Sequence, residues 1–286
     1  TGHPYLTKLW TWDKKNKYKN LYRLIKSIRA ERFCAVINAQ RFAATGLISL
    51  FSGAAIKVGF DKNPLSGYFD FVVPHTFEIG LHEVARNHQL LVAAFSDCAP
   101  AKPRLYPTEA VRKELEQYTN GAYITISPMS VWPTKTYPIA KWVDLLKGIP
   151  SKYKVYLLGG PADIGGCNQL VEEAKQAGIS LTLEIMAGKL SFQGSAVLME
   201  SAAMNYMNDS GPVHLASAVN APQVLVYCST TPFLGFGPLS ENGVFVETEE
   251  VLPCRPCGIT GKKECPLQHF NCAMGIKTSQ FPIPQA

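Results

Sequence analysis

The residues best suited to chemistry lie in three loops of the second half of the chain, at 127–135, 159–163 and 208–214. The first loop ends at Lys135, a cation that can neutralise a phosphate group. In the third loop, Asp209 and Ser210 precede a Gly-Pro pair, which predicts the start of a helix. Glycine lets a ligand approach the backbone, and free N–H groups at a helix start attract anions. Together these loops predict a site for a phosphorylated ligand.

A purely structural explanation also exists for each of these residues. Asp209 or Ser210 is typical of a helix N-cap, and His214 is typical of a surface or core histidine. The loop at 159–163 lacks the G-x-G-x-x-G spacing of dinucleotide-binding folds, and no glycine-rich loop leads into Gly-Lys-Ser/Thr. These patterns disfavour NAD binding and P-loop hydrolysis, and they leave the phosphate site open.

The elements that must position these loops alternate between strands and helices. Apolar spacing predicts, in the first half, strands at 33–37 and 56–60 with helices at 16–30, 42–51 and 108–118. In the second half it predicts strands at 123–126, 155–158, 181–185, 203–207 and 223–227, and helices at 139–147, 167–177, 192–201 and 212–219. This alternation predicts parallel sheets in two Rossmann-like domains, 1–120 and 121–286, with a boundary near Asn120 and Gly121. Ligands of such sheets bind beyond the carboxyl ends of the strands, where the three loops lie.

Composition narrows the class of protein. Apolar residues make up 47% of the 286 residues and charged residues 17%, which favours a large core and excludes disorder as the main state. The nearly uncharged stretch 42–56 is shorter than the ~18 apolar residues of a membrane-spanning helix, so we expect none. Residues 1–120 carry 17 Lys and Arg against 10 Asp and Glu, whereas residues 121–286 carry 11 against 12. The basic first half fits nucleic acid, an anionic membrane surface or a phosphorylated substrate, and equally a solvated basic helix.

An ordered series of motifs gives a more specific indication. The segments are 130–138, 155–163, 187–192, 208–216 and 253–258, with 36–41 and 82–87 in the first half. The series resembles that of the ADP-heptose:lipopolysaccharide heptosyltransferases, glycosyltransferase family 9, over nearly the whole chain. The resemblance implies the GT-B architecture, in which two Rossmann-like domains face each other across a cleft. It also implies an acceptor-binding first domain and a donor-binding second domain.

The resemblance further implies a reaction. A heptose would pass from ADP-L-glycero-D-manno-heptose to the lipopolysaccharide inner core, either lipid A–Kdo or the heptosylated core, with inversion at the anomeric carbon. No cofactor or metal is implied, and the chain contains no Asp-x-Asp motif. The implied partners are the nucleotide-sugar donor and an anionic lipopolysaccharide precursor, without nucleic acid. The implied place is the cytoplasm, with peripheral contact to the inner membrane of a Gram-negative bacterium.

Motif positions carry the family's site residues onto this chain. Lys135 and Asp209 are the expected catalytic residues, and Ser130 is expected to contact the diphosphate with Lys135. Gln193 stands where the family often has a ribose-binding Glu, and a neutral amide should hold the ribose more weakly. The residues expected to bind the donor are Ser130, Lys135, Gly188, Lys189, Gln193, Asp209, Ser210, Gly211 and His214.

The chain departs from the family pattern at both ends. Family members begin with a strand, a Gly-Asp loop and a helix that supply the Asp base, and this chain starts at Thr1 beyond that unit. We therefore expect a truncated first domain with the base upstream of Thr1. Residues 277–286 hold two prolines and lack helical periodicity. A fragment of an active transferase, a degenerate member that binds nucleotide-sugar without catalysis, and a family transferase with a different donor all fit.

Cysteines cluster near the end of the chain, at Cys254, Cys257, Cys265 and Cys272. Four thiols in so short a segment can hold Zn²⁺ or an iron–sulfur cluster. Their spacing matches no standard site, so reduced thiols or a redox-labile pair fit as well. The other four cysteines are scattered singly, a pattern typical of a cytosolic protein.

Overall fold

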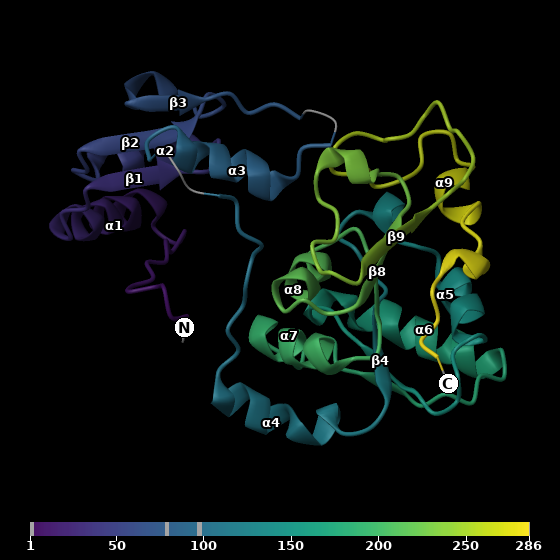
Figure 1. The fold of residues 1–286 in the computed structure, drawn as a ribbon. Coiled ribbons are helices and arrows are strands. Elements are labelled where there is room, and N and C mark those ends of the chain that lie inside the picture. The colour runs from purple at the N-terminus through teal and green to yellow at the C-terminus, as the bar shows by residue number, and fades with distance from the viewer. Residues whose placement is uncertain (1–2, 78–79, 96–98, 286) are drawn as a thin grey trace. The chain divides into compact units, whose positions relative to one another are not determined.

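The computed structural model describes residues 3–77, 80–95 and 99–285. The chain forms two compact units, and the boundary between them lies between Ala101 and Lys102. Each unit contains a parallel β-sheet with helices packed on it (Figure 1). This confirms the predicted α/β class. Within the described residues, no helix combines the length and apolar character needed to cross a bilayer.

The first unit is built on a three-stranded sheet in the order β1-β2-β3. Its strands and helices are β1 (Ala35–Asn38), β2 (Ile56–Phe60), β3 (Phe71–Val73), α1 (Lys17–Ala30), α2 (Ala43–Phe51) and α3 (Glu83–Val92), with a 3-10 turn at Ser66–Tyr68. Leu90 of α3 packs on Val58, Phe60 and Val73 to form the buried core. Among the α1 side chains only Leu21 is buried, so most of this basic helix is open to solvent.

The second unit contains a six-stranded parallel sheet in the order β6-β5-β4-β7-β8-β9. Its strands are β4 (Tyr123–Ser127), β5 (Lys154–Leu157), β6 (Leu183–Ile185), β7 (Asn205–Asn208), β8 (Gln223–Tyr227) and β9 (Gly243–Glu247). Its helices are α4 (Glu109–Thr119), α5 (Ile139–Leu146), α6 (Ile164–Gln176), α7 (Phe192–Ser201), α8 (Pro212–Ala218) and α9 (Asn271–Met274). Shorter 3-10 turns occur at Pro133–Lys135, Pro161–Asp163, Pro232–Leu234 and Thr278–Gln280.

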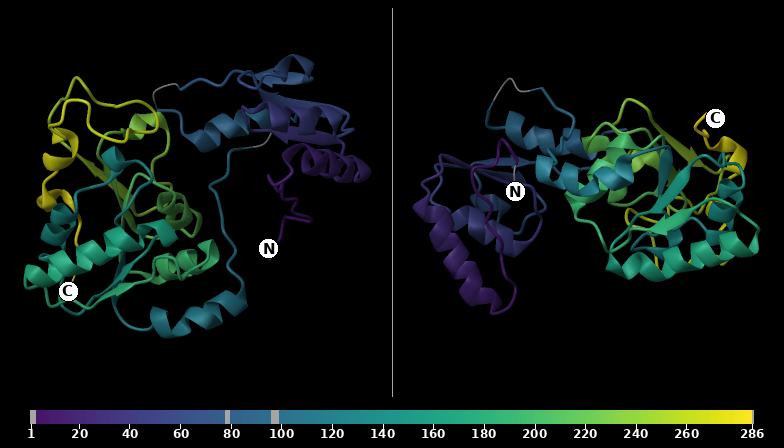
Figure 2. Two further views of the ribbon diagram at one scale, coloured as in Figure 1. Left: turned by 180° about the vertical axis from the view of Figure 1, so that it is seen from behind. Right: turned by 90° about the horizontal axis from the view of Figure 1, so that it is seen from below.

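Helices cover both faces of this sheet, because alternate strand residues point to opposite sides. Ile126 and Leu157 face a core that includes Trp142 of α5 and Leu170 of α6. On the other face, Tyr156 and Met207 meet Leu198 of α7 and Val213 of α8. Figure 1 shows these two layers, and Figure 2 shows the same layers from two further directions.

The strand order reverses at β4. The chain passes from β4 outward to β5 and β6, then returns to place β7 on the other side of β4. Loops that follow β4 and β7 therefore diverge to opposite sheet faces, and the gap between such loops is where open α/β sheets bind ligands. Residues 128–135 and 208–214, two of the three chemically promising loops, leave the sheet at this point.

Helix α4 belongs to the second unit, which corrects the predicted boundary near Asn120 and Gly121. Its side chain Leu115 is 3% exposed, and Arg112 forms an ion pair with Glu200 of α7. Thr108 caps the helix by accepting a hydrogen bond from Val111 N at 3.4 Å. The prolines before α4 predicted that this region separates the two domains. Instead, the apolar face of α4 packs on α7, so α4 is part of the second unit.

The predicted helices and strands of the second unit are present, with shifts at their ends. Helix α6 begins at Ile164, before the predicted start at Cys167, and its first turn includes Gly165 and Gly166. In the first unit, strand β1 runs from Ala35 to Asn38, whereas the predicted strand was 33–37. The sequence patterns did not indicate β3, α3, β9 or α9.

Candidate functional site

Lys135 and Asp209 form a largely buried ion pair at the strand-order reversal. The Nζ atom of Lys135 lies 2.7 Å from Oδ2 of Asp209, and the two side chains are 13% and 10% exposed. Lys135 ends the 3-10 turn after β4, and Asp209 directly follows β7. An ammonium group has three N–H donors, so one can bind Asp209 while others are directed to a phosphate. The pair therefore unites the two residues that the motifs assigned to catalysis.

Asn208, the last residue of β7, fixes the position of the loop that carries Lys135. Its Oδ1 accepts a hydrogen bond from Tyr137 N at 2.9 Å, and its Nδ2 donates to Pro128 O at 2.7 Å. Asn208 is fully buried. Both ends of the loop after β4 are thus anchored to the end of β7, which keeps Lys135 next to Asp209.

Residues 229 and 230, which follow β8, form hydrogen bonds with Asp209 and with the turn that carries Lys135. Thr230 Oγ1 donates to Asp209 Oδ2 at 2.7 Å, and Ser229 Oγ donates to Thr134 Oγ1 at 3.0 Å. Residues 253–267, here called the cysteine loop, complete the contact, since Lys262 N donates to Thr134 Oγ1 at 2.8 Å. In this buried network, the Thr230 hydroxyl donates a hydrogen bond to the Asp209 carboxylate. The Thr134 hydroxyl, in the turn that carries Lys135, accepts hydrogen bonds from Ser229 and Lys262.

A cavity of about 500 Å³ opens within the second unit, and its wall includes Ser210, the residue that follows Asp209. This volume is in the range of small-molecule sites. Its wall comes from the loops after β4, β5, β6 and β7, and the apolar part of that wall includes Met129, Leu158, Pro161, Leu190, Met199 and Leu215. Val131 and Phe192 line the cavity and are 90% and 78% exposed, so they offer uncovered apolar surface to a bound group. An apolar cavity of this volume suits a ligand with an aromatic ring.

The structure brings only some of the predicted donor residues to this cavity. Ser130, Ser210 and Gly211 line it, whereas Lys135, Asp209 and Gly188 are not among its lining residues. Gly188 forms the turn after β6 with φ of +75°, and its N–H donates to Gly159 O at 2.9 Å. A side chain there would press on Pro161, so the glycine serves close packing of two loops.

Three other predicted residues lie outside the wall of the cavity. Lys189 and His214 are exposed, His214 in the first turn of α8. Gln193 Oε1 accepts a hydrogen bond from Thr108 N at 3.4 Å, which directs this amide oxygen to the segment before α4. The residues that sequence reasoning missed are the apolar ones of the wall. They lie in loops and in the helices α7 and α8, and an apolar residue gives no chemical signal by itself.

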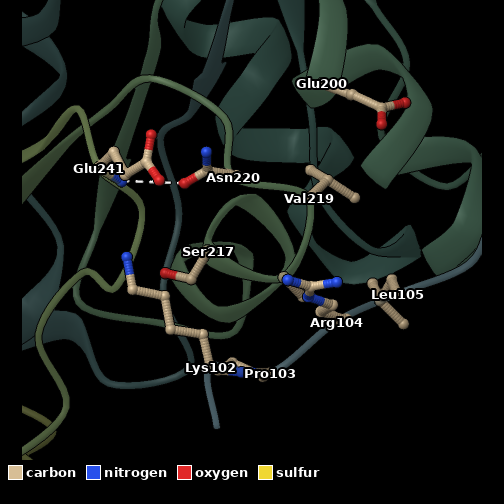
Figure 3. A pocket seen from close by; sticks show the side chains of 10 residues that line it. Lys102, Pro103, Arg104, Leu105, Glu200, Ser217, Val219, Asn220 and Glu241 are labelled. Atoms are coloured by element: carbon tan, nitrogen blue, oxygen red, sulfur yellow. Dashed lines mark hydrogen bonds between the residues drawn. The ribbon is translucent and has the colours of Figure 1, made fainter.

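A second cavity, of about 280 Å³, lies at the other end of α8 (Figure 3). Lys102 and Arg104 contribute to its wall, as do Glu200 and Glu241. Glu241 N donates to Asn220 Oδ1 at 2.9 Å across its edge. Charges of both signs therefore surround this cavity.

The cysteine loop does not present a metal-binding set. Across residues 3–77, 80–95 and 99–285, no three His, Cys, Asp or Glu side chains group in a way that could hold a metal ion. Cys254 Sγ lies 3.9 Å from His269 Nε2, and all cysteines in the described ranges are free thiols. Burial, with nearby Cys254, raises the pKa of Cys257, whereas four backbone N–H groups at 267–270 outweigh burial and lower the pKa of Cys265.

Comparisons with known proteins agree with the motif series. The model of glycosyltransferase family 9 (heptosyltransferase) matches residues 21–270. Lipopolysaccharide heptosyltransferase 3 of Escherichia coli is 24% identical over 236 residues, which covers 79% of this chain and 68% of that protein. Lipopolysaccharide heptosyltransferase 1 of Pseudomonas aeruginosa is 25% identical over 269 residues, covering 91% and 70%.

Solved structures show the same fold. The ADP-heptose lps heptosyltransferase II of Escherichia coli matches with a TM-score of 0.69 at 20% identity, over 88% of this chain and 78% of that one. A glycosyl transferase family 9 protein from Veillonella parvula matches with a TM-score of 0.72 at 18% identity, over 82% and 68%. The Escherichia coli heptosyltransferase WaaC with ADP matches with a TM-score of 0.62 at 20% identity, over 82% and 72%.

Proposed function

The chain belongs to glycosyltransferase family 9, the heptosyltransferases, and from this premise we propose that it transfers a heptose from ADP-L-glycero-D-manno-heptose to the lipopolysaccharide inner core. The curated relatives are lipopolysaccharide heptosyltransferases, which supports an acceptor of this class. The observation that carries the choice of donor is the ion pair of Lys135 with Asp209 at 2.7 Å, because Asp209 directly precedes Ser210 in the wall of a cavity of about 500 Å³. We infer that a nucleoside occupies the apolar cavity and that its diphosphate extends past Ser210 toward Lys135.

The chain's own residues would act mainly on the leaving group. As the acceptor hydroxyl attacks the anomeric carbon and gives its proton to a base, the bond to ADP breaks and negative charge develops on the diphosphate. Lys135 stabilises that charge, and the N–H groups near Ser210 and Gly211 add to it. Attack on the face opposite ADP inverts the anomeric centre. The proposed reaction uses no metal, because a preorganised ammonium group supplies the positive charge.

Asp209 has a separate part in this proposal. The residue as a whole is 7% exposed, and its carboxylate accepts a hydrogen bond from Thr230. The carboxylate is therefore expected to stay in place when the donor binds. The remaining lone pairs of its oxygens can accept hydrogen bonds from sugar hydroxyls. Asp209 would therefore orient the heptose while it holds Lys135 toward the diphosphate.

The first unit supplies charge that suits the acceptor. Helix α1 contains five Lys and Arg residues and no acidic residue. Tyr18 and Tyr22, one turn apart, are 81% and 68% exposed among those cations. Aromatic and basic side chains on one helix face are typical of proteins that lie on anionic membranes. We propose peripheral contact with the cytoplasmic face of the inner membrane, where an anionic lipopolysaccharide precursor is presented.

Calorimetric titration with ADP-heptose tests the donor, and a product assay with lipid A–Kdo tests the transfer. Lys135→Ala is expected to weaken donor binding about tenfold or more, since it removes a charge-assisted contact and leaves Asp209 to repel the diphosphate. Lys147→Ala is the matched control, because Lys147 pairs with Asp144 at 2.8 Å on the exposed face of α5. Binding without transfer would favour the non-catalytic member, and no binding by the folded wild type would contradict the proposal.

A further inference from the structure

Two residues that were not among the predicted site residues are connected to the ion pair by hydrogen bonds. The first is Arg255 of the cysteine loop, whose side chain is 9% exposed. Its Nε donates to Cys228 O at 2.8 Å, and its Nη2 donates to Thr230 O at 2.7 Å and to Tyr227 O at 3.3 Å. The same guanidinium is 2.6 Å from Glu247 Oε2 at the end of β9.

The cysteine loop therefore fixes the position of the backbone at residues 227–230. Cys257 N donates to Ser229 O at 2.8 Å, which adds the one carbonyl that Arg255 does not bind. All four consecutive carbonyls from 227 to 230 are thus hydrogen-bonded by residues 255 and 257. A guanidinium presents several donors in a rigid plane, so it defines both the position and the orientation of the carbonyls that it binds.

The side chains of this segment face the ion pair. Thr230, fully buried, donates from Oγ1 to Asp209 Oδ2 at 2.7 Å, and the same oxygen atom is 2.7 Å from Lys135 Nζ. Two charge-assisted contacts to the same carboxylate oxygen fix the position of that oxygen. The position of Lys135 then depends on Asp209, that of Asp209 on Thr230, and that of Thr230 on Arg255.

We propose that Thr230 and Arg255 are positioning residues for the donor diphosphate: through Asp209 they hold the Lys135 ammonium at the place where the phosphates bind. This inference rests on the proposed function, since it assumes that Lys135 meets a diphosphate. It assigns a role in the donor site to the cysteine loop, whose thiols have no part in that role. A merely structural role of the same residues would lower stability without changing affinity for phosphates in particular.

The experiment compares the affinities of ADP and adenosine by calorimetry, because adenosine lacks the groups that Lys135 would meet. Thr230→Val removes the hydroxyl donor at nearly constant volume. We expect it to weaken ADP binding about tenfold, the effect of losing one hydrogen bond to a charged group, and to leave adenosine binding unchanged. Thr230→Ser keeps the donor and is expected to restore ADP affinity to within about twofold.

Thr125→Val is the matched control. Thr125 is also fully buried, and its Oγ1 donates to Asn205 Oδ1 at 2.6 Å in the middle of the sheet. It should lower stability, as Thr230→Val does, without changing the ratio of ADP to adenosine affinity. Arg255→Lys, which keeps the charge but loses the fork of donors, should lower that ratio as Thr230→Val does.

The outcomes separate this inference from the proposed function. If the wild type binds ADP and Lys135→Ala weakens that binding, an unchanged ratio in Thr230→Val would overturn the positioning role alone. Equal weakening of ADP and adenosine would overturn it as well, because the effect would then be structural. Absence of ADP binding to the folded wild type, or Lys135→Ala without effect, would overturn the proposed function and this inference with it.

Discussion

Gly261 of the cysteine loop lies directly against the side chain of Lys135. A Cβ atom at position 261 would come within 2.9 Å of Lys135 Cγ and 3.2 Å of Thr134 Oγ1. The glycine has φ of +80°, a conformation that L side chains rarely adopt. The absence of a side chain at 261 thus lets the loop cover the aliphatic part of Lys135 while its ammonium group remains at Asp209.

Gly261→Ala is expected to displace Lys135 and weaken ADP binding by about tenfold. It should also lower the free energy of unfolding by about 1 kcal/mol because of the positive φ. Gly258→Ala is the control, since Gly258 has φ of +85° in the same loop and a Cβ atom there would meet nothing within 4 Å. Titration with ADP and urea unfolding measure the two effects. Equal ADP affinities in the two variants would show that contact with Lys135 is unimportant.

A second glycine pair tests the wall of the cavity. A Cβ at Gly166 in α6 would overlap Sδ and Cε of Met129, which lines the cavity, whereas a Cβ at Gly165 would meet nothing within 4 Å. Gly166→Ala is expected to push Met129 toward the cavity and weaken adenosine binding several-fold. Gly165→Ala should leave adenosine affinity unchanged and stabilise the helix by about 0.5 kcal/mol. Adenosine titration and thermal unfolding of both variants would show this, and equal affinities would place the nucleoside elsewhere.

Leu115 tests the assignment of α4 to the second unit. Its side chain is 3% exposed, and a Cβ on Gly194 of α7 would be 3.3 Å from Leu115 Cδ1, so the two helices are in close contact. Leu115→Ala should lower the free energy of unfolding by about 2 to 5 kcal/mol, the usual cost of such a truncation in a packed core. Glu114→Ala, on the exposed face of the same helix, should change it by less than about 0.5 kcal/mol. Similar urea midpoints for the two variants would mean that α4 is not packed on α7.

Periodicity predicted most of the second unit, but it did not predict which loops meet. Strands β4 and β7 lie far apart in the chain, and their adjacency depends on where the strand order reverses. The motifs placed Lys135 and Asp209 in one site, whereas their mutual ion pair follows only from that adjacency. Strand β3 was missed because its three residues include two exposed apolar side chains, Phe71 and Val72, and so lack alternation.

The role of Arg255 and the environment of Gln193 could not be predicted for a different reason. An arginine next to cysteines suggests chemistry at the thiols, but its hydrogen bonds go to backbone carbonyls, which carry no sequence signal. Gln193 is in the first turn of α7, where Thr108 from the segment before α4 donates to it. Because α4 was assigned to the first domain, this contact was outside the predicted site.

Thiol reactivity gives the last prediction. Burial opposes ionisation of Cys265, but backbone N–H groups of residues 267–270 outweigh it, so the pKa of this thiol is lowered. Burial raises the pKa of Cys272 to about 11 and also raises that of Cys257. Because the thiolate is the nucleophile, Cys265 carries the larger reactive fraction at neutral pH.

Iodoacetamide at pH 7 is therefore expected to alkylate Cys265 several-fold faster than Cys257 and Cys272, as followed by peptide mass spectrometry. The advantage should shrink once the pH exceeds the lowered pKa of Cys265, because that thiol is then fully ionised while the thiolate fractions of Cys257 and Cys272 still increase with pH. The exposed Cys34 provides a reference for accessibility. In urea the backbone donors are lost, so Cys265 and Cys34 should then react at similar rates. Faster alkylation of Cys257 in the folded protein would contradict the hydrogen-bonded environment of Cys265.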